Sequence, residues 1–96
     1  MEPRIVERDM AVSHADFHRT LPAALGRRPV AGVDGTVTLE DRGRKVTIEL
    51  GPEQTRTLGQ IVLPLTHVRI AFTGYEEGDV TAFLDRFDAY FRRGGG

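Results

Sequence analysis

Hydrophobic residues recur at two different periods in the last third of the chain. The segment QIVLPLTHVRIAFTG, which begins at Gln60, has apolar residues at every second position, as expected for two β-strands with one buried face. These residues are Ile61, Leu63, Val68, Ile70 and Phe72. In the following segment, YEEGDVTAFLDRFDAYFRR, the spacing becomes helical, and the stripe consists of Val80, Phe83, Leu84, Phe87, Tyr90 and Phe91. The pattern predicts a helix that covers one face of a sheet.

The beginning of the chain repeats this combination of strand and helix. Residues 5–12 are predicted to form a strand whose inward side carries Val6, Met10 and Val12. Ser13 fits the N-cap of a helix that begins at His14, because Asp16 occupies the N3 position of a capping box. Val12 and Phe17 fit the two positions of a hydrophobic staple. The buried stripe of this helix should consist of Phe17, Leu21, Ala24 and Leu25.

Two residues should shape the end of this first helix. Gly26 is placed where a left-handed glycine ends a helix. Pro22 has no N–H to donate to the carbonyl of His18, so we expect it to kink the helix or to divide it.

Two turn signals divide the middle of the chain into short strands. Asp34-Gly35 predicts a two-residue hairpin between residues 29–33 and 36–40, and Arg42-Gly43 predicts another between 36–40 and 45–50. The second turn pairs Val37 with Ile48, Thr38 with Thr47, Leu39 with Val46, and Glu40 with Lys45. Each pair is chemically compatible, which supports this register.

Two boundaries are left open by the pattern. Residues 51–59 are polar and contain Gly-Pro, so they should form a loop or an irregular edge strand. The last helix should begin between Glu76 and Val80, with Asp79 as its N-cap.

The predicted fold class is α+β. The order is strand, helix, four or more antiparallel strands, helix. We expect a two-layer sandwich in which a sheet of four to six strands carries both helices on one face. The 96 residues should form a single domain, residues 1–96, with residues 94–96 as a flexible glycine tail.

The order of elements resembles the TATA-binding-protein-like and helix-grip topologies. At the sequence level, the segments FHRTLPAALGRRP, LPLTHVRIAFTGY and FLDRFDAYFRRGGG resemble a group of short uncharacterised proteobacterial proteins. The resemblance covers most of the chain and implies a bacterial source. It carries no catalytic motif, and a shared fold alone assigns no function.

Composition excludes several classes of function. The net charge of -1 comes from 13 basic and 14 acidic residues spread along the chain, so the electrostatic field is too weak to favour nucleic acid. Clustered arginines lie at predicted turns and helix ends, and all five phenylalanines are assigned to the core rather than to base stacking. No apolar run is long enough to span a membrane, and the charged N-terminus does not resemble a signal peptide. We therefore expect a cytoplasmic protein with no membrane contact and no nucleic-acid partner.

Histidines provide the strongest candidates for metal or catalytic chemistry. His14 and His18 stand one helical turn apart, which is the spacing at which two imidazoles can bind one zinc ion. In the zinc metalloprotease motif a glutamate follows the first histidine, but here that residue is Ala15. His67 could complete a site only if the fold brought it close. We expect no metal and no cofactor, and the two histidines are more simply explained as exposed polar residues.

The predicted sheet offers a surface as the alternative to a reactive site. Its outward positions are small or β-branched and lightly charged, and they include Val33, Thr36, Thr38, Thr47, Val62, Arg69, Ala71 and Thr73. The main interpretation is a non-enzymatic binding module that uses this uncovered face to contact a protein partner or a second copy of itself. The alternative is a small ligand- or metal-binding domain or enzyme that uses His14, Asp16, His18 or His67.

Overall fold

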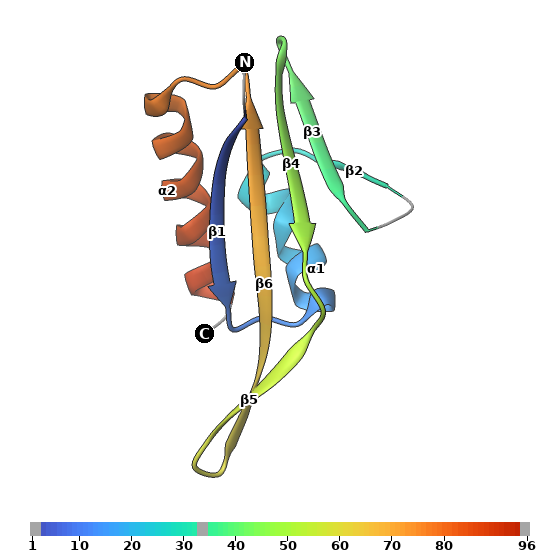
Figure 1. Ribbon diagram of the computed structural model, residues 1–96, viewed down its shortest axis with the longest axis vertical. Helices are drawn as coiled ribbons and strands as arrows, with labels where there is room; N and C mark the ends of the chain where they lie inside the picture. Colours follow the sequence, from blue (N-terminus) through green and yellow to red (C-terminus); the bar gives the residue numbers. More distant parts are fainter. Residues whose placement is uncertain (1–2, 33–34, 95–96) are drawn as a thin grey trace.

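A computed structural model describes residues 3–32 and 35–94 and confirms the α+β class. The elements in chain order are β1 (Arg4–Met10), α1 (His14–Leu25), β2 (Val30–Ala31), β3 (Val37–Asp41), β4 (Arg44–Leu50), β5 (Gln54–Leu58), β6 (Ile61–Thr73) and α2 (Glu77–Gly94). The strands form one antiparallel sheet in the order β1-β6-β4-β3-β2, and β5 also pairs with β6 (Figure 1).

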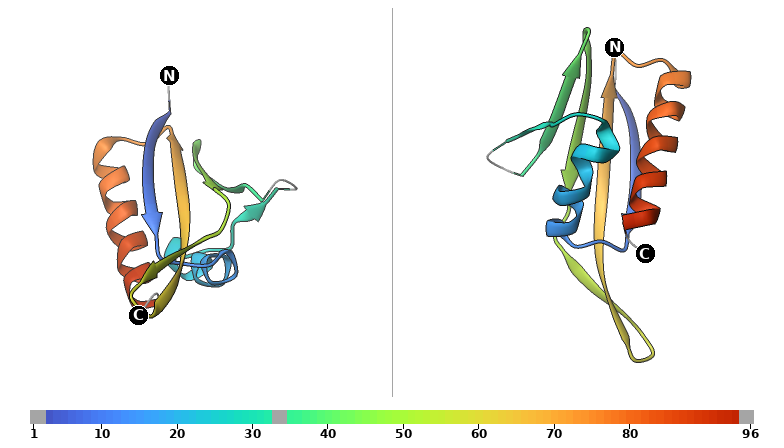
Figure 2. Two further views of the ribbon diagram at one scale, coloured as in Figure 1. Left: turned by 60° about the horizontal axis from the view of Figure 1, so that its bottom comes forward. Right: turned by 180° about the vertical axis from the view of Figure 1, so that it is seen from behind.

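Both helices cover the same face of the sheet, as the views from behind and below show (Figure 2). The core lies between this face and the helices and contains Val12, Phe17, Leu21, Ala24, Val37, Val46, Ile48, Val68, Ile70, Phe72, Val80, Phe87 and Phe91. Phenylalanines from the two helices meet in its centre, where the rings of Phe17 and Phe91 stack at 5.0 Å. The opposite face of the sheet is left uncovered.

The hairpin between β3 and β4 has the predicted register. Leu39 pairs with Val46 and Glu40 with Lys45. Arg42 and Gly43 form the two-residue loop, with φ angles of 52° and 79°. Positive φ at both loop residues matches the twist of a two-stranded ribbon.

The hairpin between β2 and β3 is shifted by one residue from the predicted register. A two-residue loop at Asp34-Gly35 would place Ala31 opposite Thr38, whereas Ala31 lies opposite Val37. The N–H of Gly32 donates to the carbonyl of Thr36 at 2.7 Å, so three residues separate the paired residues instead of the predicted two. Val33 and Asp34 lie outside the described residues.

The prediction of two strands after Gln60 is wrong, because β6 is one continuous strand. Near Thr66 its apolar residues change from odd to even positions. The sequence pattern interpreted this change as a break between two strands. Of the two alternatives left open for residues 51–59, the strand is found: residues 54–58 form β5, which pairs with the first part of β6 through a turn at Gly59, whose φ is 60°. We call this projecting hairpin, residues 54–65, the arm; it lies at the end of the longest dimension, 46 Å (Figure 1).

The first helix begins where the sequence predicted. The side chain of Ser13 accepts a hydrogen bond from the N–H of Asp16 at 3.1 Å, and Gly26 ends the helix with a φ of 77°. Pro22 lies inside the helix but does not divide it.

The second helix begins within the predicted range, Glu76 to Val80, but its N-cap and its end differ from prediction. It begins at Glu77, so Asp79 is not the N-cap but the third residue of the helix; its carboxylate accepts from the N–H of Glu76 at 3.4 Å. At the other end the helix includes Gly94, the first residue of the predicted tail, while Gly95 and Gly96 lie outside the described residues.

Candidate functional site

The uncovered sheet face brings most of the predicted surface residues together. Antiparallel pairing places Thr38 opposite Thr47, Thr47 opposite Ala71, and Ala71 opposite Ile5. These four residues form a row across four strands, and each is half-buried. Arg69 and Thr73 lie on either side of Ala71 along β6, on the same face because alternate residues of a strand share a face. The row carries no charge, and its two central residues, Thr47 and Ala71, are small.

One predicted member of this surface lies elsewhere. Val62 is not on the central sheet but on the arm, where 63% of its surface is exposed. By alternation it belongs to the same side as Thr66 and Val68, but the arm extends beyond the helices that would cover it. Val33 lies outside the described residues.

The face is more charged than its sequence pattern indicated. Lys45 and Glu49 of β4 alternate with Thr47, and Glu7 of β1 lies opposite Arg69. The guanidinium of Arg69 lies 3.8 Å from the carboxylate of Glu49. Lys45 and Glu49 could already be placed on this side by alternation with Thr47, whereas Glu7 could be assigned to it only once the pairing of β1 with β6 was known.

His67 lies between two carboxylates at the end of this face that is nearest to the arm. Its Nδ1 is 2.8 Å from Asp9 and its Nε2 is 2.9 Å from Glu7. An ionised carboxylate only accepts hydrogen bonds, so this arrangement favours the imidazolium form, in which both ring nitrogens carry protons. The hydrogen bond with Asp9, followed by that with Glu7, raises the pKa of His67 above its ordinary value. We call Glu7, Asp9 and His67 the acidic cluster.

The other two histidines do not join this cluster. The Nε2–H of His14 donates to the carbonyl of Gly51 at 2.8 Å, and its backbone N–H donates to the carboxylate of Glu53 at 2.6 Å. These bonds attach the start of α1 to the segment between β4 and β5. His18 is exposed, with its ring edge against Phe17. Within residues 3–32 and 35–94, no group of three or more histidine, cysteine, aspartate or glutamate side chains is arranged to hold a metal ion.

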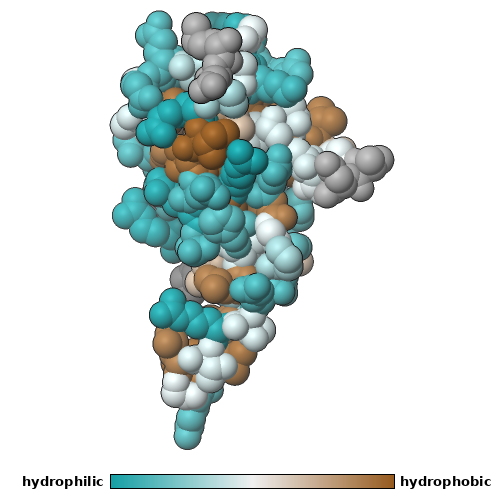
Figure 3. Space-filling view, viewed as in Figure 1, coloured by the Kyte–Doolittle hydropathy of each residue, from teal (hydrophilic) through white to brown (hydrophobic). Residues whose placement is uncertain are grey.

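In the part of the chain that the structure describes, three of the four large hydrophobic residues that are exposed lie on the arm. Leu58, Ile61 and Val62 are exposed by 49%, 61% and 63%, and Val30 in β2 by 72%. Figure 3 shows hydrophobic surface in the upper part of the uncovered face and again along the arm, with mainly hydrophilic residues between the two. Isolated exposed apolar residues are ordinary, but several on one projecting hairpin indicate a contact surface.

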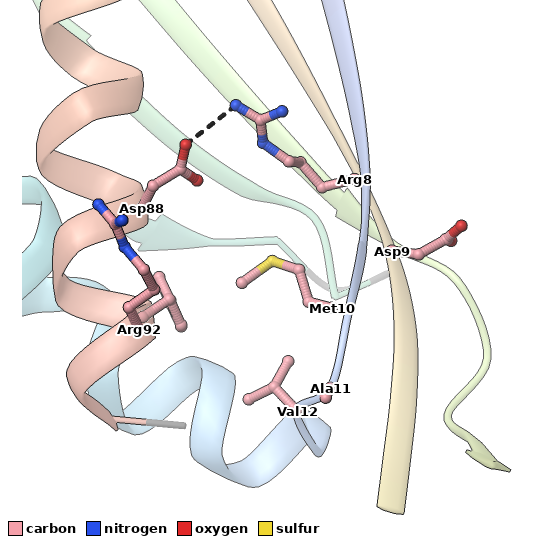
Figure 4. A pocket seen from close by; sticks show the side chains of 8 residues that line it. Arg8, Asp9, Met10, Ala11, Val12, Asp88 and Arg92 are labelled. Atoms are coloured by element: carbon pink, nitrogen blue, oxygen red, sulfur yellow. Dashed lines mark hydrogen bonds and ion pairs between the residues drawn. The ribbon is translucent and has the colours of Figure 1, made fainter. Parts of the chain in front are cut away.

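A depression of about 520 Å³ lies between the end of β1 and the last turns of α2 (Figure 4). Its apolar lining includes Met10, Val12 and Phe91, and its charged lining includes Arg8, Asp88 and Arg92. The guanidinium of Arg8 lies 3.0 Å from the carboxylate of Asp88, while its buried Nε has no hydrogen-bond partner. The Arg8–Asp88 pair connects β1 to α2, which gives these charges a structural role.

Comparisons with protein-family models, with curated proteins and with solved structures give no match to this chain. Neither helix in the described part of the chain combines the length and the apolar character that a membrane span needs. Only the surfaces of the molecule therefore indicate a function.

Proposed function

We propose that the protein is a small non-enzymatic interaction module that binds a protein partner, or a second copy of itself, through its uncovered sheet face. The observation that carries this proposal is the continuity of the face with the arm. β6 contributes to both, so one strand connects the uncharged row around Ala71 with the exposed residues at the end of the arm. A regular strand presents alternate side chains on one face, which suits recognition of another surface.

The composition of this surface supports a protein partner. Thr38, Thr47 and Ala71 form an uncharged centre, and charged residues such as Glu7 and Arg69 lie around it. Protein interfaces have the same arrangement, with a centre poor in charge and a polar rim. The proposal includes a cytoplasmic bacterial setting, in keeping with a sequence that contains no cysteine.

The alternative is a histidine-based ligand site, metal site or small enzyme. Its candidate residues have separate hydrogen-bond partners: His14 bonds to Gly51, whereas His67 bonds to Asp9 and Glu7. A shared ligand would have to displace these bonds. This cost favours the interaction module.

A substitution at the centre of the face tests the proposal. Thr47→Asp should abolish partner capture or self-association, because an unpaired carboxylate is costly to bury at an interface and harmless in water. The matched control is Thr81→Asp, at an exposed position on α2. Affinity purification from the native host, with circular dichroism of each variant, provides the measurement. Capture that survives Thr47→Asp but is lost in His14→Ala or His18→Ala would favour the histidine-based alternative.

A further inference from the structure

Both edges of the arm are protected against pairing with another strand. Arg56 is the middle residue of β5, so pairing of two β5 strands about a two-fold axis at this residue would place two guanidinium groups opposite each other. Pro64 lies in the arm part of β6 and has no N–H to donate to a further strand. Charged residues and prolines are common protective features of exposed strand edges. A partner should therefore contact a face of the arm.

One face of the arm is mainly apolar. Leu58 lies opposite Ile61, Arg56 opposite Leu63, and Gln54 opposite Leu65. Residues directly opposite share a face, and alternate residues of a strand do so too, so these six side chains belong to one side of the ribbon. The other side carries two threonines with Val62 and Pro64. The apolar side thus combines four large hydrophobic residues with a single positive charge.

The arm has no cover of its own. None of its residues belongs to the buried core, and an isolated two-stranded hairpin is marginally stable in water. Arg56 is the only charged residue between Gln54 and Leu65, and it forms no ion pair with the described part of the chain. This depletion of charge is typical of the centre of an interface.

A complementary charge lies at the base of the arm. The acidic cluster contains two carboxylates and one imidazole, so it is negative whether or not His67 is protonated. His67 follows Leu65 by two residues on β6, which places the cluster next to the arm along the same strand. The chain therefore carries a positively charged apolar projection and, beside it, a negatively charged surface.

We infer that the arm docks onto a second copy of this chain, with its apolar side covered by the copy and with Arg56 beside Glu7 and Asp9 of the second copy. This inference rests on the proposed function and names the partner. Because both complementary surfaces belong to one chain, a two-fold arrangement makes each contact twice and closes the assembly as a dimer.

Sedimentation velocity of the full chain over a range of concentrations tests the apolar contact. The unmodified protein should form a dimer, and Ile61→Asp should convert it to a monomer while leaving the circular dichroism spectrum unchanged. The matched control is Val30→Asp, which adds the same charge at a more exposed apolar residue outside the arm. This control should remain dimeric.

Charge reversal tests the predicted ion pairs. Arg56→Glu should weaken the dimer by about tenfold or more, and adding Glu7→Lys and Asp9→Lys should restore most of the loss. Arg28→Glu, at another exposed arginine, is the control and should have little effect. If reversing the charges on both sides restores the dimer, the loss in Arg56→Glu comes from the broken ion pairs and not from misfolding.

Three outcomes would overturn the inference. They are a monomer at every concentration, a dimer that survives Ile61→Asp, and a dimer that is insensitive to Arg56→Glu. The proposed function has a separate criterion, since it fails only if Thr47→Asp leaves the capture of every partner unchanged. A monomer that still captures a partner through the sheet face would thus reject the dimer and retain the interaction module.

Discussion

Thr66 shows how one polar residue can hold two segments together inside the core. It is fully buried, and its hydroxyl donates to the carbonyl of Val12 at 2.7 Å, where the chain passes from β1 to α1. A buried carbonyl without a donor is unfavourable, so the hydroxyl satisfies a group that water cannot reach. Thr66 also lies where the apolar residues of β6 change phase, and the sequence pattern alone did not identify this role.

Replacement of Thr66 by valine should lower the free energy of unfolding by about 1–3 kcal/mol, because the shape is retained while the carbonyl of Val12 loses its donor. Urea denaturation measures the change. Thr73→Val, at an exposed position of the same strand, is the control and should change stability by less than about 0.5 kcal/mol. Equal effects of the two substitutions would show that the buried hydrogen bond contributes little.

The pKa of His67 should be measurably raised in the folded protein. Its bonds with Asp9 and Glu7 favour the charged imidazole, so this group stabilises the fold fully at pH values below its unfolded pKa of about 6.5. The contribution is lost as the pH rises through the higher folded pKa. NMR titration of the ring protons should show this shift, and the Glu7→Gln, Asp9→Asn double variant should lower the pKa. An unchanged pKa in the double variant would contradict the assignment.

The elements that could be predicted are those in which turn or capping residues and the apolar pattern agree within a short stretch of sequence. The hairpin between β3 and β4 was predictable because the Arg42-Gly43 turn and the pairing of Val46 with Leu39 require the same register. The start of α1 was predictable because the capping and apolar signals agree at Ser13. Both cases depend on residues close together in sequence.

The misassigned elements depend on contacts between distant segments. Ile61 alternates with Leu63 like a core residue, but it lies in the arm and is exposed, so its predicted place on the buried face is wrong. The charge of the uncovered face was underestimated for a related reason. Glu7 and Asp9 join this face only through the pairing of β1 with β6, which no local pattern specifies.

The aromatic contact between the two helices should contribute strongly to stability. Phe87 is fully buried, and its ring centroid lies 4.6 Å from that of Phe91 and 6.2 Å from that of Phe17. Phe87→Ala should therefore cost about 3–5 kcal/mol in the free energy of unfolding. Phe83→Ala, at a half-buried position on the same helix, should cost less. Guanidinium denaturation of both variants provides the comparison, and a reversed order would show that α2 packs differently.

The molecule divides into a packed body and an arm that adds nothing to the buried core. We expect that replacing residues 54–65 by Asn-Gly leaves the body folded, because Gln54 and Leu65 are paired and a short turn can connect the residues beside them. The shortened chain should keep its helical circular dichroism signal and unfold in one cooperative transition. According to the dimer inference it should also be monomeric in sedimentation velocity. Loss of cooperative unfolding would show that the body needs the arm.

The central position of β6 has a consequence for the order in which the chain can fold. β6 lies between β1 and β4, although β1 is near the N-terminus and β6 is near the C-terminus. Among the described strands β1 pairs only with β6, so during synthesis it stays unpaired until β6 has emerged from the ribosome, whereas the hairpin between β3 and β4 can form from adjacent residues. Such distant pairing slows folding because a long segment must be ordered before the pairing can stabilise it. The last of the described strands is therefore the one that completes the sheet, and until it forms the apolar side of β1 remains open to contacts with other chains.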